Sequence, residues 1–315
     1  MSKIALVGVG LVGRAWAVSF ACAGHEVAIW DEQPEAIDDA LGFVNGVLPD
    51  LDAHDLLRGE PPLSVRSRMR RAASLEEALD GASHVQESTP EDVKTKQRVF
   101  ADLDRLADPE AVLASSTSAI LPSIFSERLK GRGRCLVVHP INPPYLVPAV
   151  EIVPAPWTER DAVMRAAALL ESAGHAPIVM GREIDGFVVN RLQGALLEEA
   201  FRLVADGCAT TEDVDVAIRK GLALRWSFMG PFETIDLNAP GGVRDYAERY
   251  QHIYARIFPS TQRRVDWAGG AMDGIEAERR RRLPADQLAE RAAWRDRRLM
   301  ALAAHKKQAG EEIGE

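Results

Sequence analysis

The stretch KIALVGVGLVGRAWAVSFACAGHEVAIWD, residues 3–31, decides the fold. Residues 3–8 form an apolar run that predicts a buried strand, and residues 11–23 are rich in small apolar side chains and predict a helix. Gly24 stands where it can end that helix. Residues 26–31 predict a second strand that ends in an acid. A strand, a glycine-rich turn, a helix and a strand within about 30 residues make one βαβ unit.

The turn between the first strand and the helix, GVGLVG, carries glycines with the spacing G-x-G-x-x-G. Gly8 permits a tight turn, Gly10 lets the backbone approach a pyrophosphate at the helix N-terminus, and Gly13 lets the helix pack against the strand. We therefore expect a dinucleotide to bind at Gly8, Gly10, Leu11, Val12 and Gly13. The spacing alone is a weak signal, but its place between a strand and a helix makes it specific.

Asp31, at the end of the second predicted strand, is placed to accept hydrogen bonds from the adenosine ribose hydroxyls. Asp31 and Glu32 would repel a 2′-phosphate, and no arginine follows in the adjacent sequence. These features favour NAD over NADP. Two other interpretations of the N-terminus are a glycine-rich structural turn and a secretory signal peptide, although Arg14 interrupts the apolar stretch that a signal peptide needs.

Strand and helix patterns alternate as far as residue 185, with strands near 84–88, 111–116, 134–139, 148–154 and 176–180, and helices over 34–58, 91–105, 121–127 and 158–174. This alternation predicts an α/β fold, a Rossmann-type doubly wound and mostly parallel sheet with helices on both faces. After residue 185 only helical patterns continue, over 186–206, 211–221, 242–257 and 285–308. We therefore predict a dinucleotide-binding domain over residues 1–185 and an all-helical domain over residues 186–315.

The composition of the 315 residues, 46% hydrophobic and 27% charged, is that of a soluble globular protein. A net charge of -9 argues against nucleic acid or an anionic membrane as a partner, and the basic run 278–282 predicts a solvated helix face. No apolar run is long enough to span a bilayer. Cys22, Cys135 and Cys208 are few, odd in number and far apart, which predicts no metal site, no disulfide framework and a cytoplasmic location.

A second stretch, VVHPINPPYLVPAVEIV at 137–153, contains a histidine and a glutamate in unusual surroundings. His139 ends a predicted inner strand at the edge of the sheet where ligands bind, and the prolines that follow restrict the loop. Glu151 lies in an apolar strand, where an unpaired carboxylate is costly, so it should have a partner. A histidine paired with it would be a good general base. The alternative, a structural histidine with an unrelated glutamate, stays open on these residues alone.

The other six histidines are expected in turns or on solvated faces: His25, His54, His84, His175, His252 and His305.

Several blocks of the sequence resemble one known family. ASSTSAI (114–120), VVHPINPPY (137–145), AVEIVP (149–154) and DGFVVNRLQGALLEEAFRLVADG (185–207) are similar to blocks of the 3-hydroxyacyl-CoA dehydrogenase superfamily. The HPxNPPY motif, LALRWSFMGPFETIDLNAPGG (222–242) and AAWRDRRLMALAAHKK (292–307) resemble its lambda-crystallin/L-gulonate 3-dehydrogenase branch. The resemblance spans nearly the whole chain.

The resemblance implies a catalytic pair formed by His139 and Glu151. It also implies that Ser118, in the STS turn, and Asn190, in GFVVNR, hydrogen-bond the reacting oxygen of the substrate or hold the geometry of the site. Dimerisation through the helical domain is a further implication.

The resemblance also places NAD contacts at Asp31, Glu91 and Lys96. Without it, Glu91 would be interpreted as an acid placed favourably at a helix N-terminus, and Lys96 as part of a solvated face.

Arg225 precedes the MGPFE segment, where the acyl-CoA branch of the superfamily has no arginine. A guanidinium is suited to bind a carboxylate through two hydrogen bonds, so we interpret Arg225 as the ligand of a free acid. An inter-domain or surface salt bridge is the alternative.

Together these features predict a homodimeric, NAD-dependent dehydrogenase that oxidises the 3-hydroxyl of a small hydroxy acid, with an L-gulonate-like sugar acid favoured. The alternatives are a dehydrogenase of CoA thioesters, a dehydrogenase of another small carboxylated alcohol such as carnitine or hydroxybutyrate, and a non-catalytic NAD-binding protein of the crystallin type.

Overall fold

The computed structural model describes residues 2–314, which form two compact units. The first unit contains the residues up to Val189 together with Ala293–Glu312, and the second contains Asn190–Ala292 with the residues from Ile313. The last helix, α14 (Leu288–Ile313), therefore belongs mainly with the first unit, whereas the predicted division groups every residue after 185 in one helical domain. The division into domains 1–185 and 186–315 stays a prediction.

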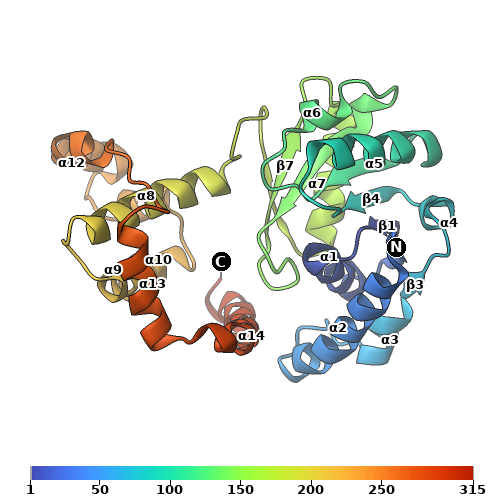
Figure 1. The fold of residues 1–315 in the computed structure, drawn as a ribbon, viewed down its shortest axis with the longest axis horizontal. Coiled ribbons are helices and arrows are strands. Elements are labelled where there is room, and N and C mark those ends of the chain that lie inside the picture. The colour runs from blue at the N-terminus through green and yellow to red at the C-terminus, as the bar shows by residue number, and fades with distance from the viewer. Residues whose placement is uncertain (1, 315) are drawn as a thin grey trace. The chain divides into compact units, whose positions relative to one another are not determined.

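An eight-stranded sheet forms the centre of the first unit (Figure 1). The strands run in the spatial order β3-β2-β1-β4-β5-β6-β7-β8, and neighbours are parallel except β6 and β7, which are antiparallel. Their bounds are β1 (Lys3–Val7), β2 (Glu26–Trp30), β3 (Met69–Arg71), β4 (His84–Glu87), β5 (Val112–Ser115), β6 (Cys135–Pro140), β7 (Ala149–Pro154) and β8 (Ala176–Val179). The predicted doubly wound, mostly parallel sheet is confirmed.

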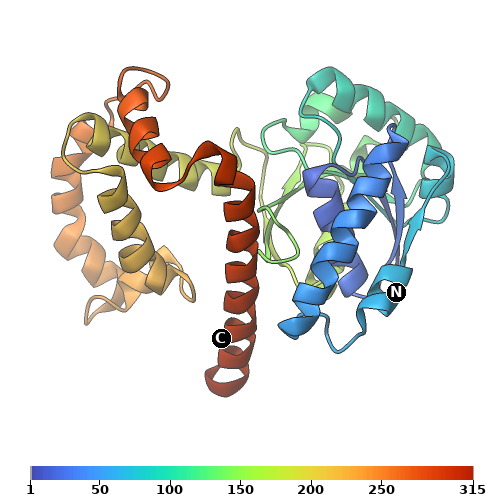
Figure 2. The ribbon, with the colours of Figure 1, turned by 60° about the horizontal axis from the view of Figure 1, so that its bottom comes forward.

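Successive residues of a strand point to opposite faces of the sheet. Both faces of this sheet are apolar, so helices cover both. In β1, Ile4 and Leu6 belong to one apolar cluster, and Ala5 and Val7 belong to the other. The first cluster packs against α1 (Leu11–Cys22), α2 (Pro34–Ala53), α3 (Pro62–Ser67), α7 (Arg160–Ser172) and Met300 of α14, and α1 and α2 lie side by side (Figure 2). The second packs against α4 (Leu75–Leu79), α5 (Val93–Leu106) and α6 (Pro122–Ser126).

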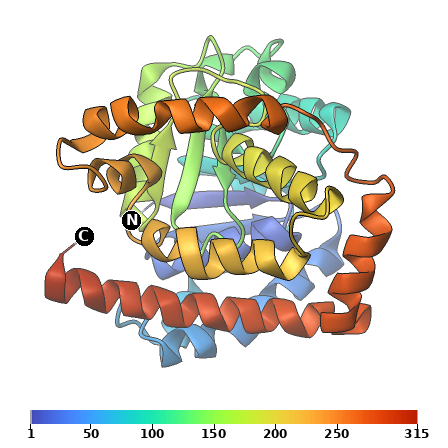
Figure 3. The ribbon, with the colours of Figure 1, turned by 90° about the vertical axis from the view of Figure 1, so that its left-hand side faces the viewer.

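The second unit contains helices and no strand among its described residues (Figure 3). Its helices are α8 (Val189–Ala205), α9 (Thr211–Ala217), a π-helical turn (Ile218–Leu222), α10 (Ala223–Trp226), α11 (Pro231–Asp236), α12 (Gly242–Thr261) and α13 (Ala271–Arg282). The run 278–282 ends α13, and two of its arginines form ion pairs with acids of α9. None of the helices described for residues 2–314 is long and apolar enough to cross a membrane.

Candidate active site

The antiparallel pairing of β6 and β7 places His139 directly opposite Glu151. The imidazole Nδ1 lies 2.7 Å from Glu151 Oε2, and the two residues are only 5% and 0% exposed. The partner that a carboxylate in an apolar strand requires is therefore present across the ladder. The ring of Phe187 lies with its centroid 5.5 Å from that of His139 and forms an apolar wall beside the imidazole.

The second oxygen of Glu151 binds the backbone where the turn before α8 leads into that helix. Oε1 accepts hydrogen bonds from the backbone N–H groups of Val188 at 2.6 Å and Val189 at 2.9 Å. Burial disfavours the charged form of Glu151, but the hydrogen bonds from His139, Val189 and Val188 outweigh it and lower the pKa of this carboxyl. Glu151 is therefore an ionised carboxylate near neutral pH.

This carboxylate determines which nitrogen of His139 can accept a proton. An ionised carboxylate only accepts hydrogen bonds, so the proton of the neutral imidazole lies on Nδ1. Nε2 then carries the lone pair. The arrangement leaves one basic nitrogen, and a negative charge behind it that stabilises the imidazolium.

Ser118 lies in the turn after β5, and His139 lies near the carboxyl end of the neighbouring parallel strand β6, so both are at the same edge of the sheet. Glu91 holds this turn: its Oε1 accepts hydrogen bonds from Thr117 Oγ1 at 2.5 Å and from the N–H groups of Ser118 and Ala119, each at 3.0 Å. Ser118 itself is exposed. The structure thus gives Glu91 a positioning role beside its predicted contact with NAD.

Lys96 is 1% exposed, so its interpretation as part of a solvated face is wrong. Its ammonium lies 2.8 and 3.0 Å from the two oxygens of Glu87 and 3.0 Å from the carbonyl of Thr89. Glu87 also accepts a hydrogen bond from Ser115 Oγ at 2.6 Å. Glu87 was not among the predicted site residues, although an acid at the end of an apolar strand needs a partner as Glu151 does.

The glycine-rich turn has the close contacts that its spacing requires. Gly8 has a φ of +86°, and a Cβ there would lie 2.8 Å from backbone atoms of Ser88 and Thr89. A Cβ on Gly13 would lie 2.0 Å from the carbonyl oxygen of Gly8, so the helix could not pack here with any larger residue. Gly10, the N-cap of α1, has open space where its Cβ would be.

The two residues between these glycines differ in environment. Leu11 begins α1 and is 61% exposed, and Val12 packs partly against the apolar core.

A pocket of about 520 Å³ opens beside this turn and is lined by Gly8, Gly10 and Asp31 among others. Asp31 holds the surrounding backbone: Oδ2 accepts from Val9 N–H at 2.8 Å and Oδ1 from Gln33 N–H at 2.9 Å. A pocket of this size, with an open helix N-terminus and an acid beside it, fits the adenosine half of a dinucleotide.

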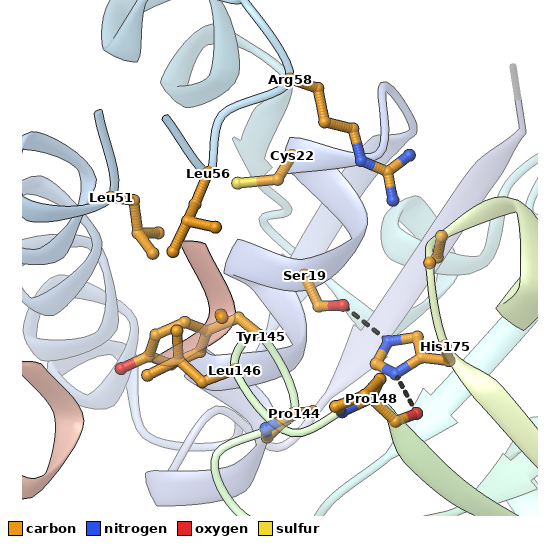
Figure 4. Close-up of a pocket in the computed structure, with 13 residues that line it drawn as sticks. Ser19, Cys22, Leu51, Leu56, Arg58, Pro144, Tyr145, Leu146, Pro148 and His175 are labelled. Carbon is orange, nitrogen blue, oxygen red and sulfur yellow. Dashed lines mark hydrogen bonds between the residues drawn. The ribbon is translucent and has the colours of Figure 1, made fainter. Parts of the chain in front are cut away.

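Three of the histidines predicted in turns or on solvated faces are buried: His25, His84 and His175 are 6%, 2% and 8% exposed. His25 and His175 do lie in the turns that lead into β2 and β8, whereas His84 lies in β4, so the prediction is wrong for His84. Figure 4 shows His175, whose Nε2 lies 2.8 Å from Ser19 Oγ and whose Nδ1 lies 3.2 Å from the carbonyl of Pro148. Burial lowers the pKa of His84 and that of His175 to about 4. These rings are neutral members of the core.

The remaining three agree better with the prediction, since His54 is half-buried and His252 and His305 are exposed.

Two predicted site residues lie in the second unit. Asn190 is half-buried in the first turn of α8, and Arg225 is exposed on α10. Their roles toward the substrate stay predictions. Among residues 2–314 no group of three or more His, Cys, Asp or Glu side chains could hold a metal ion.

Known proteins match this chain over most or nearly all of its length. It is 41% identical over 308 residues to the lambda-crystallin homolog of Bos taurus, covering 97% of this chain and 96% of the relative. It is 38% identical over 251 residues to the L-carnitine dehydrogenase of Oceanobacillus iheyensis, covering 79% and 80%. The solved structure of the NAD⁺-dependent 5-formyl-3-hydroxy-2-methylpyridine 4-carboxylic acid 5-dehydrogenase superposes with a TM-score of 0.82 at 25% identity, covering 98% of both chains.

The doubly wound sheet and the glycine-rich turn before its first helix are typical of a dinucleotide-dependent dehydrogenase. Residues 3–184 match the family model of the 3-hydroxyacyl-CoA dehydrogenase NAD-binding domain, and residues 186–269 match that of the 3-hydroxyacyl-CoA dehydrogenase C-terminal domain. The chain belongs to the 3-hydroxyacyl-CoA dehydrogenase superfamily, in its lambda-crystallin branch. It is an NAD-dependent oxidoreductase that acts on a CH–OH group.

Proposed function

We propose that this enzyme oxidises the 3-hydroxyl group of a small free hydroxy acid to the 3-keto acid, with an L-gulonate-like sugar acid as the leading substrate. The observation that carries the proposal is the hydrogen bond between His139 and Glu151, which leaves Nε2 of a buried imidazole as a base. NAD, when bound, accepts the hydride from the substrate carbon. Nε2 of His139 takes the hydroxyl proton, and the C–O bond becomes a carbonyl.

Each of the other site residues has a distinct task in this proposal. Glu151 orients the imidazole and stabilises its positive charge after proton transfer. Ser118 and Asn190 hold the oxygen on which charge changes during the reaction. Gly8, Gly10 and Asp31 hold the cofactor, and the protein thereby supplies position and electrostatics.

Arg225 carries the preference for a free acid over a thioester. Its guanidinium can bind a carboxylate through two parallel hydrogen bonds, and a CoA thioester offers no such charge. A relative named for L-carnitine and a solved structure named for a pyridine carboxylic acid support a small substrate of this kind. A salt bridge of Arg225 within the protein remains the alternative role.

A substrate panel tests the proposal. Purified enzyme is mixed with NAD and a series of 3-hydroxy acids, including L-gulonate, L-carnitine and 3-hydroxybutyrate, and NADH is followed by absorbance. In the reverse direction acetoacetyl-CoA is offered with NADH. We expect turnover of a free hydroxy acid that exceeds turnover of the thioester, and an increase in KM for the acid in R225M.

The opposite preference would show a dehydrogenase of CoA thioesters. Inactivity on every compound, together with tight NAD binding, would show a non-catalytic protein of the crystallin type.

A homodimer formed through the second unit is part of the proposal, as is a cytoplasmic location. The helix α12 exposes an apolar row at helical spacing, which would be covered in a dimer: Tyr250, Ile253, Tyr254, Ile257 and Phe258. Light scattering after gel filtration should give twice the mass of one chain, and I253E with I257E should give the mass of one.

A further inference from the structure

An arginine that is distant in the sequence lines the adenosine pocket. Arg98, on α5, stands at this pocket together with Asp31 and Glu32, which follow β2. Its Nη1 lies 2.6 Å from Glu32 Oε1. The sequence next to Asp31 contains no arginine, but the fold brings one from 66 residues away to the same wall.

The two acids at this wall differ in what they hold. Asp31 uses both carboxylate oxygens on backbone N–H groups, those of Val9 and Gln33, so it is part of the framework of the glycine-rich turn. Glu32 holds the side chain of Arg98, and the side chains of this pair are 55% and 56% exposed. A half-exposed ion pair is weak, so Arg98 can exchange Glu32 for another anion at little cost.

We propose that Glu32 sets the coenzyme selectivity of this enzyme by occupying Arg98, which is a latent ligand for a 2′-phosphate. A guanidinium binds a phosphate through two parallel hydrogen bonds, and the 2′-hydroxyl of the adenosine ribose is the group that carries the phosphate in NADP. With Glu32 ionised, the positive charge of Arg98 is neutralised and the 2′-phosphate meets two carboxylates. When a neutral glutamine replaces Glu32, Arg98 is released and turns to the phosphate.

The experiment compares E32Q with E35Q. Both variants remove one negative charge near the start of α2, but Glu35 lies outside the pocket and makes no contact with Arg98 in the described structure. The readout is kcat/KM for NADP divided by kcat/KM for NAD, with one saturating substrate. We expect E32Q to raise this ratio on the order of tenfold, because a like charge is removed and a cation is released, and E35Q to leave it near the wild-type value.

The double variant E32Q with R98M identifies the cation. We expect it to lose the gain of E32Q, because no guanidinium is left to bind the phosphate. An equal gain in E35Q would show that net charge alone acts, and a gain that survives R98M would show that Arg98 is not the ligand. Either result would overturn the proposal.

A binding measurement keeps the result independent of the substrate. 2′,5′-ADP and 5′-AMP fill only the adenosine pocket, so calorimetric titration of both compounds needs no turnover. We expect E32Q to gain affinity for 2′,5′-ADP and to keep its affinity for 5′-AMP. Failure of the proposed substrate would leave this result unchanged. Since Glu32 and Arg98 are half-exposed, E32Q and the double variant E32Q with R98M should both fold, and a thermal melt checks this.

Discussion

Two carboxylates buried in the first unit, Glu151 and Glu87, are used in opposite ways. Both side chains are 0% exposed, and both accept hydrogen bonds from backbone N–H groups. Glu151 pairs with the imidazole of His139, and Glu87 pairs with the ammonium of Lys96. The partner of each carboxylate decides whether the pair can take part in chemistry.

The difference lies in the atoms that remain after pairing. The three donors of the Lys96 ammonium are matched by three acceptors, the two oxygens of Glu87 and the carbonyl of Thr89. The imidazole of His139 uses Nδ1 on Glu151 and keeps the lone pair of Nε2. The first pair therefore stabilises the fold beneath the glycine-rich turn, and the second keeps an atom that can accept a proton.

The largest effect is expected from removing that atom. H139Q should lower kcat by on the order of 10²–10⁴, because general-base catalysis contributes that much, with NAD binding retained. Steady-state assays with the best substrate of the panel measure kcat, and fluorescence titration measures NAD binding. H305Q, at an exposed position, is the matched control and should keep normal turnover. Near-normal kcat in H139Q would exclude the mechanism.

The next effect concerns the Glu87–Lys96 pair and falls on stability. K96M leaves the buried carboxylate of Glu87 without its cation, which should lower the free energy of unfolding by about 3–5 kcal/mol. Urea unfolding measures the loss. K94M, an exposed lysine on the same helix, should change stability little.

A double variant separates an unpaired charge from lost packing. E87Q with K96M removes both charges, so it should recover part of the stability that K96M loses. If K96M were as stable as K94M, the pair would have no structural role, and the contrast with Glu151 would fail.

The sequence predicted the parts of this fold that depend on neighbouring residues. The βαβ unit and its glycine turn were predictable because the signals lie within residues 3–31, and Glu151 was predictable because a carboxylate stood in an apolar strand. The strand β3 was missed, since it has three residues and two of them are exposed.

The missed features are contacts between residues distant in the chain. In the sequence pattern of its helix, Lys96 falls where a solvated face is expected. Its burial depends on the carboxylate of Glu87. His175 is buried against Ser19, which is 156 positions away in the chain. Arg98 likewise pairs with the distant Glu32. Such pairings follow from the order of the strands, which one sequence does not reveal.

A smaller effect follows from the buried histidines that have no carboxylate partner. His84 lies 3.0 Å from the amide oxygen of Gln86, and His175 contacts a hydroxyl and a carbonyl. Burial lowers the pKa of both to about 4 from the ordinary value of 6.5. The unfolded chain therefore takes up protons below about pH 6.5, whereas the folded chain does so only near pH 4.

The resulting stability is complete above about pH 6.5 and is lost as the pH falls toward 4, by a few kcal/mol in total. Urea unfolding at pH 7, 6 and 5 measures the slope. The stability linked to the lowered pKa of Glu151 is lost as the pH falls through the usual range of a carboxyl and below, so the change between pH 7 and 5 reports mainly on the histidines. H175Q should reduce the slope and H305Q should leave it unchanged. Equal unfolding free energies at pH 7 and 5 would contradict the assignment.

The smallest effect tests whether a third carboxylate, Glu91, serves the proposed chemistry, as Glu151 does, or only the stability of the fold, as Glu87 does. Its Oε1 accepts three hydrogen bonds from the turn that carries Ser118, and its side chain is 45% exposed. E91Q replaces the charged acceptor by a weaker neutral one, so the turn loosens while the fold remains. We expect kcat to fall on the order of tenfold, because hydrogen bonds to a charged group are the stronger ones, with the melting temperature almost unchanged.

The control is E76Q, which changes an exposed acid on α4. A positioning role predicts that E91D, which keeps the charge, restores part of kcat. If E91Q raised only KM for NAD and left kcat intact, Glu91 would act through the cofactor and the turn would not need it.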